Sequence, residues 1–590
     1  MNKNISITAC LNKVKIGDIE SNYRSIIKLI KDNKKSELLV FPLLSLSGYS
    51  CGELFNQKEY LDQIKKYLLK IVKEVSNTVT LSIPLEYLER KYICNIVISN
   101  KKILGVVPKI CFNNYERNFF SGGKEIINKK IKLDSDVDFS YDLNFIENKS
   151  KVSFSFNTLN SDILLVPACD KTTLKSNDNI DKIYKEVSKY SSVVYLNSSN
   201  DTSTNFIIVP RVAIYENTSL VVSRLFDNCE VSHNLNLKID STKNEKEALP
   251  LDNIVNKLSK LENCKLDNTN SKFPFIEEYK SKLLDIIPLQ ARTIITRARN
   301  TNIYNMVIGV SGGLDSTLAL LALYEARKIE KKIKIYGFTL PCKGNTSTIT
   351  KSNALELLTL LKCDYIEEID ISKQVNQHLE DIKHNKEDVV YENVQARVRT
   401  LILMSIANRN QGMVIGTGDL SESALGWCTY NGDHMAMYNI NSTIPKTLIK
   451  KVVEEYSLTS NKEIQKVLHS IVNTPISPEL RKSDDGKVSQ KTEEQIGKYE
   501  INDFILYYSL KYKVDLNTMY NLIHKSFNQL SKKEIKNAMI NFYSRFFSQQ
   551  FKRNCSPEGA TITEFSLSPD KVSLPSDIDY SFIIDLIKKL

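Results

Sequence analysis

The strongest chemical signal in the sequence is a short loop rich in glycine and serine, SGGLDS, at residues 311–316. The apolar run Asn305–Val310 predicts a buried strand directly before it, and TLALLALYEARK predicts a helix directly after it. Two glycines at such a turn let the backbone aim its N–H groups at an anion above the helix N-terminus. Asp315 is negative like a phosphate, so its expected task is to hold a Mg²⁺ that bridges phosphates. An ordinary turn would need the glycines, but it would not need Ser311, Asp315 and Ser316 together.

The same loop resembles the signature of the pyrophosphate-loop ATPases, which cleave ATP between the α and β phosphates and transfer AMP. It differs from the Walker pattern GxxxxGK[ST], so transfer of the γ-phosphate is disfavoured. Taken alone, the loop implies an adenylating enzyme of unspecified substrate. Enzymes that make thiouridine, lysidine, GMP, asparagine and argininosuccinate are similar at this motif.

Four downstream segments narrow the reaction. They are YENVQARVRT (391–400), GTGDLSESALGWCTYNGDHMAMYNINSTIPKT (416–447), NTPISPEL (473–480) and FYSRFFSQQFKRNC (542–555). They resemble the long-form, glutamine-dependent NAD⁺ synthetases, and the resemblance extends over about 275–590. It implies a ligase for the last step of NAD⁺ biosynthesis, in which deamido-NAD⁺, ATP and ammonia give NAD⁺, AMP and pyrophosphate.

The resemblance also implies the site residues. The ATP contacts would be Gly309, Val310, Ser311, Gly312, Gly313, Leu314, Asp315, Ser316 and Thr417. The contacts to deamido-NAD⁺ would be Asn393, Arg397, Glu422, Trp427, Cys428, Thr429, Tyr430 and Lys552. Asp315 and Glu422 offer hard oxygen ligands suited to Mg²⁺, and both would be catalytic. Trp427 is the only tryptophan and could stack on the pyridine ring, or it could simply pack in the core. Lys552 or Arg397 could meet a phosphate or a carboxylate.

A two-step mechanism follows from this assignment. The nicotinate carboxylate attacks the α-phosphate of ATP and becomes an acyl-adenylate, and ammonia then displaces AMP. The adenylate is sensitive to hydrolysis, so the site must exclude water. The segment LPCKGNTSTITKSNA (340–354) stands where the family has a mobile loop, and we expect it to act as a lid.

The first 265 residues resemble the nitrilase-like glutaminase domain of the same family, whose Glu–Lys–Cys triad releases ammonia from glutamine. The family's FPELxLxGY appears here as FPLLSLSGY, with Leu43 in place of the general base. The lysine motif survives as VPKICFNNY, so Lys109 would be a vestigial catalytic residue, followed by Tyr115. The nucleophile motif is absent and Asn157 stands near its place. Cys169 matches a segment that helps hold glutamine, and without a base it would be a weak nucleophile.

Two domains are expected to position the residues of the two predicted sites. We predict an α/β protein with a nitrilase-like αββα sandwich over 1–265 and a Rossmann-like, doubly wound parallel sheet of the adenine nucleotide α-hydrolase type over 275–590. In the first part, strands are expected within 36–50, 93–99, 103–109, 162–168 and 193–199, with helices within 23–35 and 60–75. The polar stretch 235–275 is the expected boundary.

Composition sets outer limits on the function. Hydrophobic residues make up 42% of the 590 residues and charged residues 25%, as in ordinary globular proteins. No apolar run reaches the roughly 18 residues of a membrane span, and the N-terminus lacks a signal-peptide pattern, so we expect a cytoplasmic protein without a membrane partner. The lysines behind the net charge of +11 alternate with acids, which argues against nucleic-acid binding. Eleven unclustered cysteines argue against a disulfide framework.

Alternatives remain open at this level. The chain could be a fully glutamine-dependent synthetase with an active glutaminase domain, or a non-catalytic scaffold or regulatory paralogue. A tRNA-modifying adenylase would want a nucleic-acid-binding appendage or CxxC motifs, which are absent. The family resemblance also implies a homo-oligomer, either a dimer or an octamer, with the first domain serving mainly as structure. A separate glutaminase could supply the ammonia.

Overall fold

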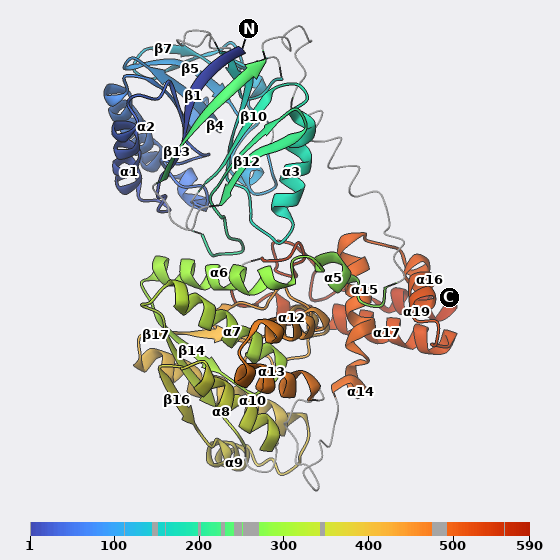
Figure 1. Ribbon diagram of the computed structural model, residues 1–590. Coiled ribbons are helices and arrows are strands. Elements are labelled where there is room, and N and C mark those ends of the chain that lie inside the picture. The colour runs from blue at the N-terminus through green and yellow to red at the C-terminus, as the bar shows by residue number, and fades with distance from the viewer. Residues whose placement is uncertain are drawn as a thin grey trace. The chain divides into compact units, whose positions relative to one another are not determined.

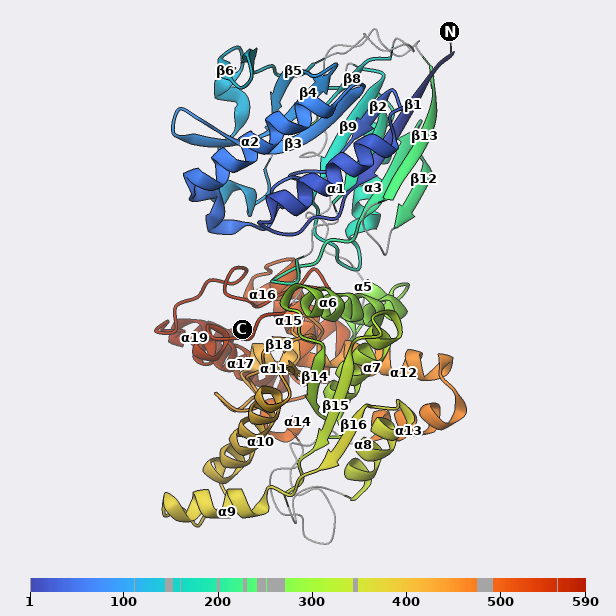
Figure 2. The same ribbon diagram turned by 90° about the vertical axis from the view of Figure 1, so that its left-hand side faces the viewer.

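The computed structural model describes residues 2–110, 112–143, 152–159, 161–198, 202–225, 231–240, 251, 271–342, 348–474, 492–559 and 561–590, and of 2–4, 231–240 and 492 only the backbone. The chain divides into two compact units (Figures 1 and 2). The first comprises Met1–Thr202 and Ile208–Lys265, and the second comprises Ser203–Ile207 and Leu266–Leu590. Three expectations fall partly outside the described residues: the middle of the lid (343–347), residues 475–480 of NTPISPEL, and most of the polar boundary (241–250 and 252–270).

The described residues of the first unit form two mixed sheets, a small antiparallel sheet of β6 (Lys130–Lys132) and β7 (Asp136–Asp138), and three α-helices. The six-stranded sheet has the order β13-β1-β2-β3-β4-β5, made of β1 (Asn2–Leu11), β2 (Leu38–Val40), β3 (Thr78–Tyr87), β4 (Arg90–Ser99), β5 (Lys102–Pro108) and β13 (Val231–Asp240). The five-stranded sheet has the order β12-β11-β10-β9-β8, made of β8 (Phe154–Ser155), β9 (Ile163–Ala168), β10 (Ser192–Asn197), β11 (Arg211–Glu216) and β12 (Ser219–Leu225). The helices are α1 (Ile19–Asp32), α2 (Lys58–Glu74) and α3 (Ser176–Val187).

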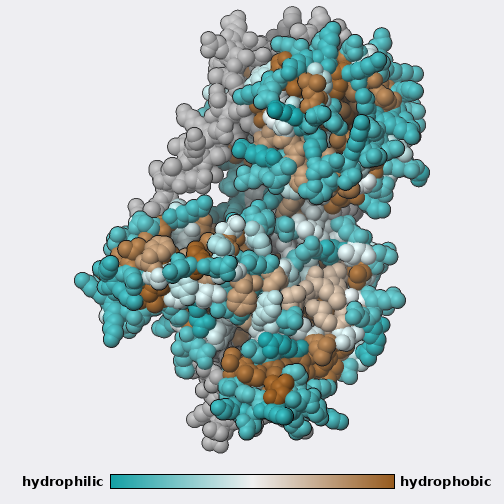
Figure 3. Space-filling view, turned by 180° about the vertical axis from the view of Figure 1, so that it is seen from behind, coloured by the Kyte–Doolittle hydropathy of each residue, from teal (hydrophilic) through white to brown (hydrophobic). Residues whose placement is uncertain are grey.

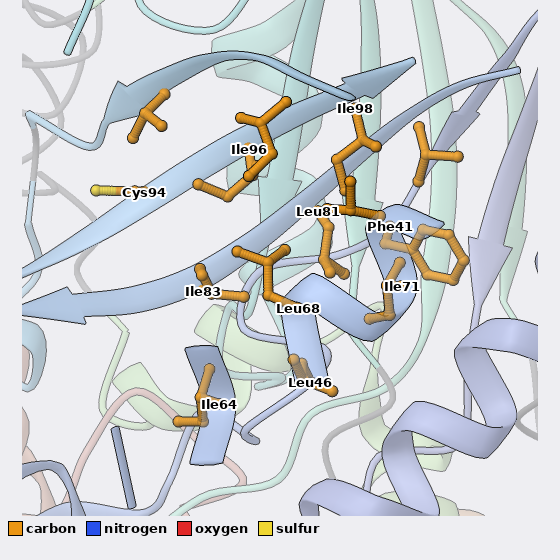
Figure 4. Close-up of a cluster of buried hydrophobic side chains, with 14 of the residues drawn as sticks. Phe41, Leu46, Ile64, Leu68, Ile71, Leu81, Ile83, Cys94, Ile96 and Ile98 are labelled. Atoms are coloured by element: carbon orange, nitrogen blue, oxygen red, sulfur yellow. The ribbon is translucent and has the colours of Figure 1, made fainter. Parts of the chain in front are cut away.

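Alternating side chains build this unit into four layers. On β4, Ile96 and Ile98 join the core that α1 and α2 cover, whereas Val97 joins the core between the two sheets. Figure 4 shows the first of these cores, where α2 presents one apolar face to β3 and β4. On β10, Val194 faces the first sheet and Tyr195 packs in a third core that includes residues of α3. The order of layers is helix, sheet, sheet, helix, which is the predicted αββα sandwich.

One strand prediction in this unit was too long. Within 36–50 only β2, three residues from Leu38 to Val40, is extended. Pro42 lacks a backbone N–H for further sheet pairing, and Leu44 (φ 53°) and Gly48 (φ 88°) turn the chain in the left-handed region. The rest of the apolar run forms a buried turn. Its hydrophobic residues therefore indicated a buried segment correctly, but not an extended strand.

A five-stranded sheet, parallel throughout, forms the centre of the second unit. Its order is β16-β15-β14-β17-β18, made of β14 (Asn305–Gly309), β15 (Lys334–Thr339), β16 (Tyr365–Glu368), β17 (Gly412–Gly416) and β18 (Tyr438–Asn439). The first strand, β14, lies in the middle, and the direction of winding reverses between β14 and β17. In doubly wound folds the crevice at the carboxyl ends of two such strands is where ligands bind.

Helices cover both faces of this parallel sheet. Figure 2 shows α10 (Val389–Arg409) on one side and α7 (Leu314–Ile329) and α8 (Thr348–Leu360) on the other. The remaining helices are α5 (Pro274–Tyr279), α6 (Ile286–Thr301), α9 (Ser372–Asp381), α11 (Leu420–Leu425), α12 (Lys446–Thr459), α13 (Lys462–Asn473), α14 (Thr492–Ile496), α15 (Tyr499–Lys511), α16 (Leu516–Ser526), α17 (Lys532–Ser548), α18 (Gln550–Arg553) and α19 (Ser581–Lys589). The α/β, doubly wound prediction is therefore confirmed. Among the described residues, no helix is both long enough and apolar enough to cross a membrane.

Candidate active site of the second unit

The SGGLDS loop joins β14 to α7 at the carboxyl edge of the sheet. Gly312 has a φ of +85°, and a Cβ on it would lie only 2.2 Å from the carbonyl oxygen of Thr350, so this position requires glycine. Two serines fix the turn: Ser311 Oγ accepts from the N–H of Gly313 at 3.2 Å, and Ser316 Oγ donates to the Gly313 carbonyl at 3.1 Å. Gly313 caps α7, a helix of 16 residues, so the predicted loop is a rigid turn at a helix N-terminus.

Three carboxylates converge beside this loop. Asp315 lies in the first turn of α7, Asp419 caps the N-terminus of α11, and Glu422 lies in the first turn of α11. One oxygen from each lies within 4.8 Å of the others. Asp315 Oδ1 is buried and has no hydrogen-bond partner among the described residues. Carboxylate oxygens are hard ligands, and one of them, Asp315 Oδ1, is still available, so the cluster suits a divalent cation.

Lys446 stands at the centre of the three carboxylates. Its Nζ lies 2.5 Å from Asp315 Oδ2, 2.7 Å from Asp419 Oδ2 and 2.9 Å from Glu422 Oε1. Burial alone would lower the pKa of Lys446, but these carboxylates hold it well above its ordinary value. Neither Lys446 nor Asp419 was predicted from the sequence. The segment PKTLI gave one indication, because it places a lysine in the first turn of an apolar helix. A lysine that is buried in such a place needs acidic partners.

The cluster carries more negative than positive charge. One ammonium faces three carboxylates, which leaves two negative charges uncompensated when all are ionised. Burial raises the pKa of Asp419 well above its ordinary value, and burial together with repulsion from Asp315 raises the pKa of Glu422 to about 7, against the opposing effect of Lys446. A bound divalent cation would supply the missing charge and would keep the carboxylates ionised.

Polar contacts from distant parts of the chain hold the cluster in place. Asp503 on α15 accepts from Ser421 Oγ and, at 2.9 and 2.7 Å, from the N–H and Oγ1 of Thr447, so it fixes the starts of both α11 and α12. Asn441 Nδ2 donates to the carbonyls of Asp315 and Thr417, both at 3.0 Å. Thr417 thus lies at the loop after β17, on the opposite side of the crevice from SGGLDS.

Four of the predicted deamido-NAD⁺ contacts, residues 427–430, directly follow the C-terminal end of α11. Gly426 ends the helix with a left-handed φ of 58°, and Trp427 follows it, half-buried. The Arg545 guanidinium lies 5.3 Å from the centre of the Trp427 ring. Lys552 Nζ donates to the carbonyls of Gly426 and Cys428 at 2.7 and 2.8 Å, so in this structure it braces the segment around the tryptophan.

The other predicted contacts join the same segment from α10. Thr429 Oγ1 donates to Asn393 Oδ1 at 2.7 Å, and the exposed Arg397 donates through Nε to the carbonyl of Tyr430 at 3.4 Å. The Tyr430 ring is 43% exposed and stacks on His434, with ring centroids 5.4 Å apart. The predicted contacts on α10, in the segment 427–430 and at Lys552 therefore lie together, whereas Glu422 lies at the other end of α11 in the carboxylate cluster.

The residues predicted in the first unit have a different environment. Lys109 Nζ lies 2.7 Å from Glu116 Oε1, and this carboxylate, which sequence reasoning missed, is 1% exposed. Leu43 is 2% exposed and offers no proton acceptor. Asn157 Nδ2 donates to the carbonyl of Pro108, the residue before Lys109, so Asn157 does stand beside the lysine. Burial and the charge of Asp170 raise the pKa of Cys169 well above that of a free thiol, which disfavours a nucleophilic thiolate.

Comparison with known proteins finds similarity to NAD⁺ synthetases. A family model described as NAD synthase matches residues 290–554. The "Glutamine-dependent NAD(+) synthetase" of Mycobacterium leprae is 29% identical over 99% of this chain and 98% of its own, and that of Thermotoga maritima is 25% identical over 85% and 88%. Over nearly its whole length the chain is similar to glutamine-dependent NAD(+) synthetases. The resemblance inferred from the loop and the downstream segments is thereby confirmed, and the matched span contains all the residues of the carboxylate cluster.

Solved structures agree with this family at the level of the fold. A glutamine-dependent NAD⁺ synthetase from Cytophaga hutchinsonii superposes with a TM-score of 0.79 at 16% identity, covering 99% of this chain and 100% of its own. One from Acinetobacter baumannii, in complex with adenosine diphosphate, superposes with a TM-score of 0.64 at 17% identity, covering 97% and 98%. At such identities the agreement extends to the architecture of both units and not to individual residues.

The buried lysine leads to a prediction about stability. Lys446→Met should lower the free energy of unfolding of the second unit by about 3–5 kcal/mol, because it leaves the buried Asp419 and the partly buried Asp315 and Glu422 without a counter-charge. Added Mn²⁺ should restore part of the loss by supplying that charge. Thermal unfolding with and without Mn²⁺ measures both effects. Lys450→Met, an exposed lysine on the same helix, is the matched control and should change little. Equal stability of the two variants would contradict the electrostatic role of Lys446.

Proposed function

We propose that the chain makes NAD⁺ from deamido-NAD⁺, ATP and ammonia, and releases AMP and pyrophosphate. The observation that carries this proposal is the carboxylate cluster of Asp315, Asp419 and Glu422, which lies beside a phosphate-type loop at the crevice between β14 and β17. A scaffold protein would have no physical need to bury three acids and one lysine there, since such groups are costly to desolvate. We also propose that residues 1–265 are a degenerate glutaminase domain and residues 275–590 the synthetase domain.

The proposed reaction has two steps. A carboxylate oxygen of deamido-NAD⁺ attacks the α-phosphorus of ATP, the bond from that phosphorus to pyrophosphate breaks, and an acyl-adenylate forms. The nitrogen of ammonia then attacks the acyl carbon, the bond to AMP breaks, and a proton is lost as the amide forms. The N–H groups of residues 311–316 would hold the phosphates, with Thr417 on the other side of the crevice.

The cluster fits Mg²⁺, the cation that usually accompanies ATP. Asp315, Asp419 and Glu422 would hold it, with the free Asp315 Oδ1 as one ligand. When bound, Mg²⁺ would offset the negative charge that develops on the departing pyrophosphate. Lys446 would keep the three carboxylates together and would offer its own charge to the phosphates.

We further propose that the first unit does not release ammonia from glutamine. Hydrolysis of glutamine by a cysteine needs a base that takes up the thiol proton, and Leu43 cannot do so. Cys169 is buried, and its raised pKa keeps it a thiol. The alternative of an active glutaminase would need another base beside Cys169. The ammonia would then come from solution or from a separate glutaminase.

The metal assignment is tested by turnover. Asp315→Ala should lower AMP formation from ATP and deamido-NAD⁺ by at least about 100-fold, since loss of a bound cation removes several kcal/mol of charge stabilisation. Circular dichroism should show an intact fold. Asp577→Ala removes an exposed carboxylate from the same unit and should leave the rate unchanged. Near-normal AMP formation by Asp315→Ala would refute the metal role of Asp315.

The nitrogen source is tested separately. With ATP and deamido-NAD⁺ present, glutamine should give no glutamate, whereas ammonium should support NAD⁺ formation. The apparent KM for total ammonium should fall from about pH 7 to about pH 9, because only NH₃ is nucleophilic and an amine with a pKa well above ambient is mostly protonated at the lower pH. A coupled assay of glutamate and NAD⁺ follows both products.

Glutamine-dependent NAD⁺ formation by the purified chain would contradict this proposal, and the variant Cys169→Ala then decides the reason. If that variant loses the glutamine-dependent activity, Cys169 is a nucleophile after all. If the activity survives, another thiol is the nucleophile and the correspondence drawn for the first 265 residues is wrong. Ammonium-dependent activity should be unchanged by Cys169→Ala in either case.

We propose that the chain assembles at least as a dimer through the surface around α10. Large apolar side chains are exposed there, and Figure 3 shows brown side chains gathered over α9 and α10 in the lower part of the view. Leu401 is 66% exposed, Val389 60% and Ile382 48%. Large apolar side chains exposed in this number favour a protein interface over solvent.

Light scattering tests the assembly. The chain should have at least twice the mass of a single copy, 67.4 kDa, and Leu401→Arg should shift it toward the single chain. Leu458→Arg places the same charge at a leucine 68% exposed on α12 and should leave the mass unchanged. A fully active species with the mass of one chain would contradict the proposal.

A further inference from the structure

Several basic side chains lie near α11 and the segment that follows it, and those of Lys446, Lys552 and Arg553 already have polar partners. Lys446 contacts three carboxylates, and Lys552 donates to two carbonyls. Arg553 donates to Gln550 Oε1 and to the carbonyls of residues 423, 424 and 546. The guanidinium of Arg545, in contrast, contacts the ring of Trp427 and has no hydrogen bond or ion pair within the described part of the chain. A half-buried arginine whose five N–H donors are not used within the described part of the chain can bind an anion.

A second polar group near this arginine also lacks a partner. Tyr499 is 2% exposed, and its hydroxyl has no hydrogen-bond partner among the described residues. The Lys446 ammonium lies 5.5 Å from the centre of its ring, which places Tyr499 next to the carboxylate cluster. Burial raises the pKa of Tyr499 well above its ordinary value, so the hydroxyl remains protonated and can donate. Burying a hydroxyl without a partner is costly, so a ligand that accepts from it would relieve that cost.

The elements that carry these groups pack on one another. Tyr499 is the first residue of α15, Arg545 lies near the C-terminal end of α17, and Trp427 follows α11, and each of these three helices contacts the other two. Burial lowers the pKa of Arg545, whereas the charge of an ionised Tyr499 would raise it, so the two groups lie within electrostatic reach. Gly426 lets the chain turn closely past α17, because a Cβ there would lie 2.3 Å from Gln549 Cβ.

We infer that Arg545 and the Tyr499 hydroxyl bind the carboxylate of the acid substrate, beside Trp427, before that carboxylate attacks ATP. The inference rests on the proposed function and adds the residues that recognise the reacting group. The guanidinium fork matches the two oxygens of a carboxylate, and the hydroxyl donates to one of them. The indole edge and face suit the aromatic ring that bears the carboxylate.

This arrangement distinguishes the substrate from the product. Deamido-NAD⁺ carries an anionic carboxylate, whereas NAD⁺ carries a neutral amide at the same position. The amide cannot form the ionic contact, and its NH₂ group would face the donors of Arg545. A site built around such polar contacts rejects an analogue that leaves them unpaired. Arg545 and Tyr499 would therefore favour binding of the acid and release of the amide.

The single tryptophan makes this inference directly measurable. Trp427 is the only tryptophan, so quenching of its fluorescence reports binding at this site. The chain should bind deamido-NAD⁺ more tightly than NAD⁺ by about 10- to 100-fold, the range expected for hydrogen bonds to a charged group. Arg545→Gln should reduce the preference to about threefold or less and should raise the KM for deamido-NAD⁺ while leaving the KM for ATP unchanged. Arg409→Gln removes an exposed arginine from the same unit and should preserve the preference.

Two further variants protect the test against misfolding. Arg545→Lys keeps the charge but loses the fork, so it should retain part of the preference, and Tyr499→Phe removes only the hydroxyl and should weaken binding of deamido-NAD⁺ but not of NAD⁺. The inference would be overturned if Arg545→Gln kept the full preference for the acid, or if the original chain bound acid and amide equally well. In either case, NAD⁺ formation by the original chain would still support the proposed function. An original chain that neither binds deamido-NAD⁺ nor forms AMP would overturn the proposed function itself.

Discussion

The buried ion cluster around Lys446 is the interaction on which the second unit depends. Strands β14 and β17 end close to this cluster, and helices α7, α11 and α12 begin there. The charged groups that these helices carry would each lack a partner without the others. Asp315 belongs to α7, Asp419 and Glu422 to α11, and Lys446 to α12. Removing the lysine would leave uncompensated charge, and removing the acids would leave a buried ammonium. The crevice between β14 and β17 therefore keeps its shape through electrostatics as much as through apolar packing.

How much of this could be predicted from the sequence depends on the range of each interaction. The SGGLDS loop was predictable because strand, turn and helix are neighbours along the chain, and the α/β architecture was predictable from apolar periodicity. Asp419 and Lys446 were not singled out, because their meaning arises only where α11 and α12 meet. Tyr499 and Arg545 are further examples: in the sequence both belong to ordinary helical patterns, and only the packing of α15 and α17 leaves their polar atoms without partners.

In the first unit, Lys109 has a structural partner, whereas Leu43 lies among apolar side chains. Glu116 is 1% exposed and accepts from Lys109 and from the N–H of Asn113, so loss of Lys109 would leave a buried carboxylate without its counter-charge. Leucine at position 43 has no such consequence, because it is an apolar side chain in an apolar environment. The pair of Lys109 and Glu116 can therefore persist for structural reasons alone. Its survival does not argue for hydrolysis of glutamine, and it explains why a lysine motif without its base remains recognisable in the sequence.

The short helix α11 separates the two positively charged groups that the proposed reaction needs. The reaction must bring two anions together, since a carboxylate attacks a phosphate, and each needs its own source of positive charge. The N-terminal end of α11 carries Asp419 and Glu422, which would hold a cation against the phosphates. Its C-terminal end leads into Trp427, where Arg545 would hold the carboxylate. The helix has six residues and is therefore about 9 Å long, so the two groups are kept apart by its length and yet remain close enough for a reactant to bridge them. A lengthened or shortened α11 would retain both binding groups but would lose the spacing that turns them into one site.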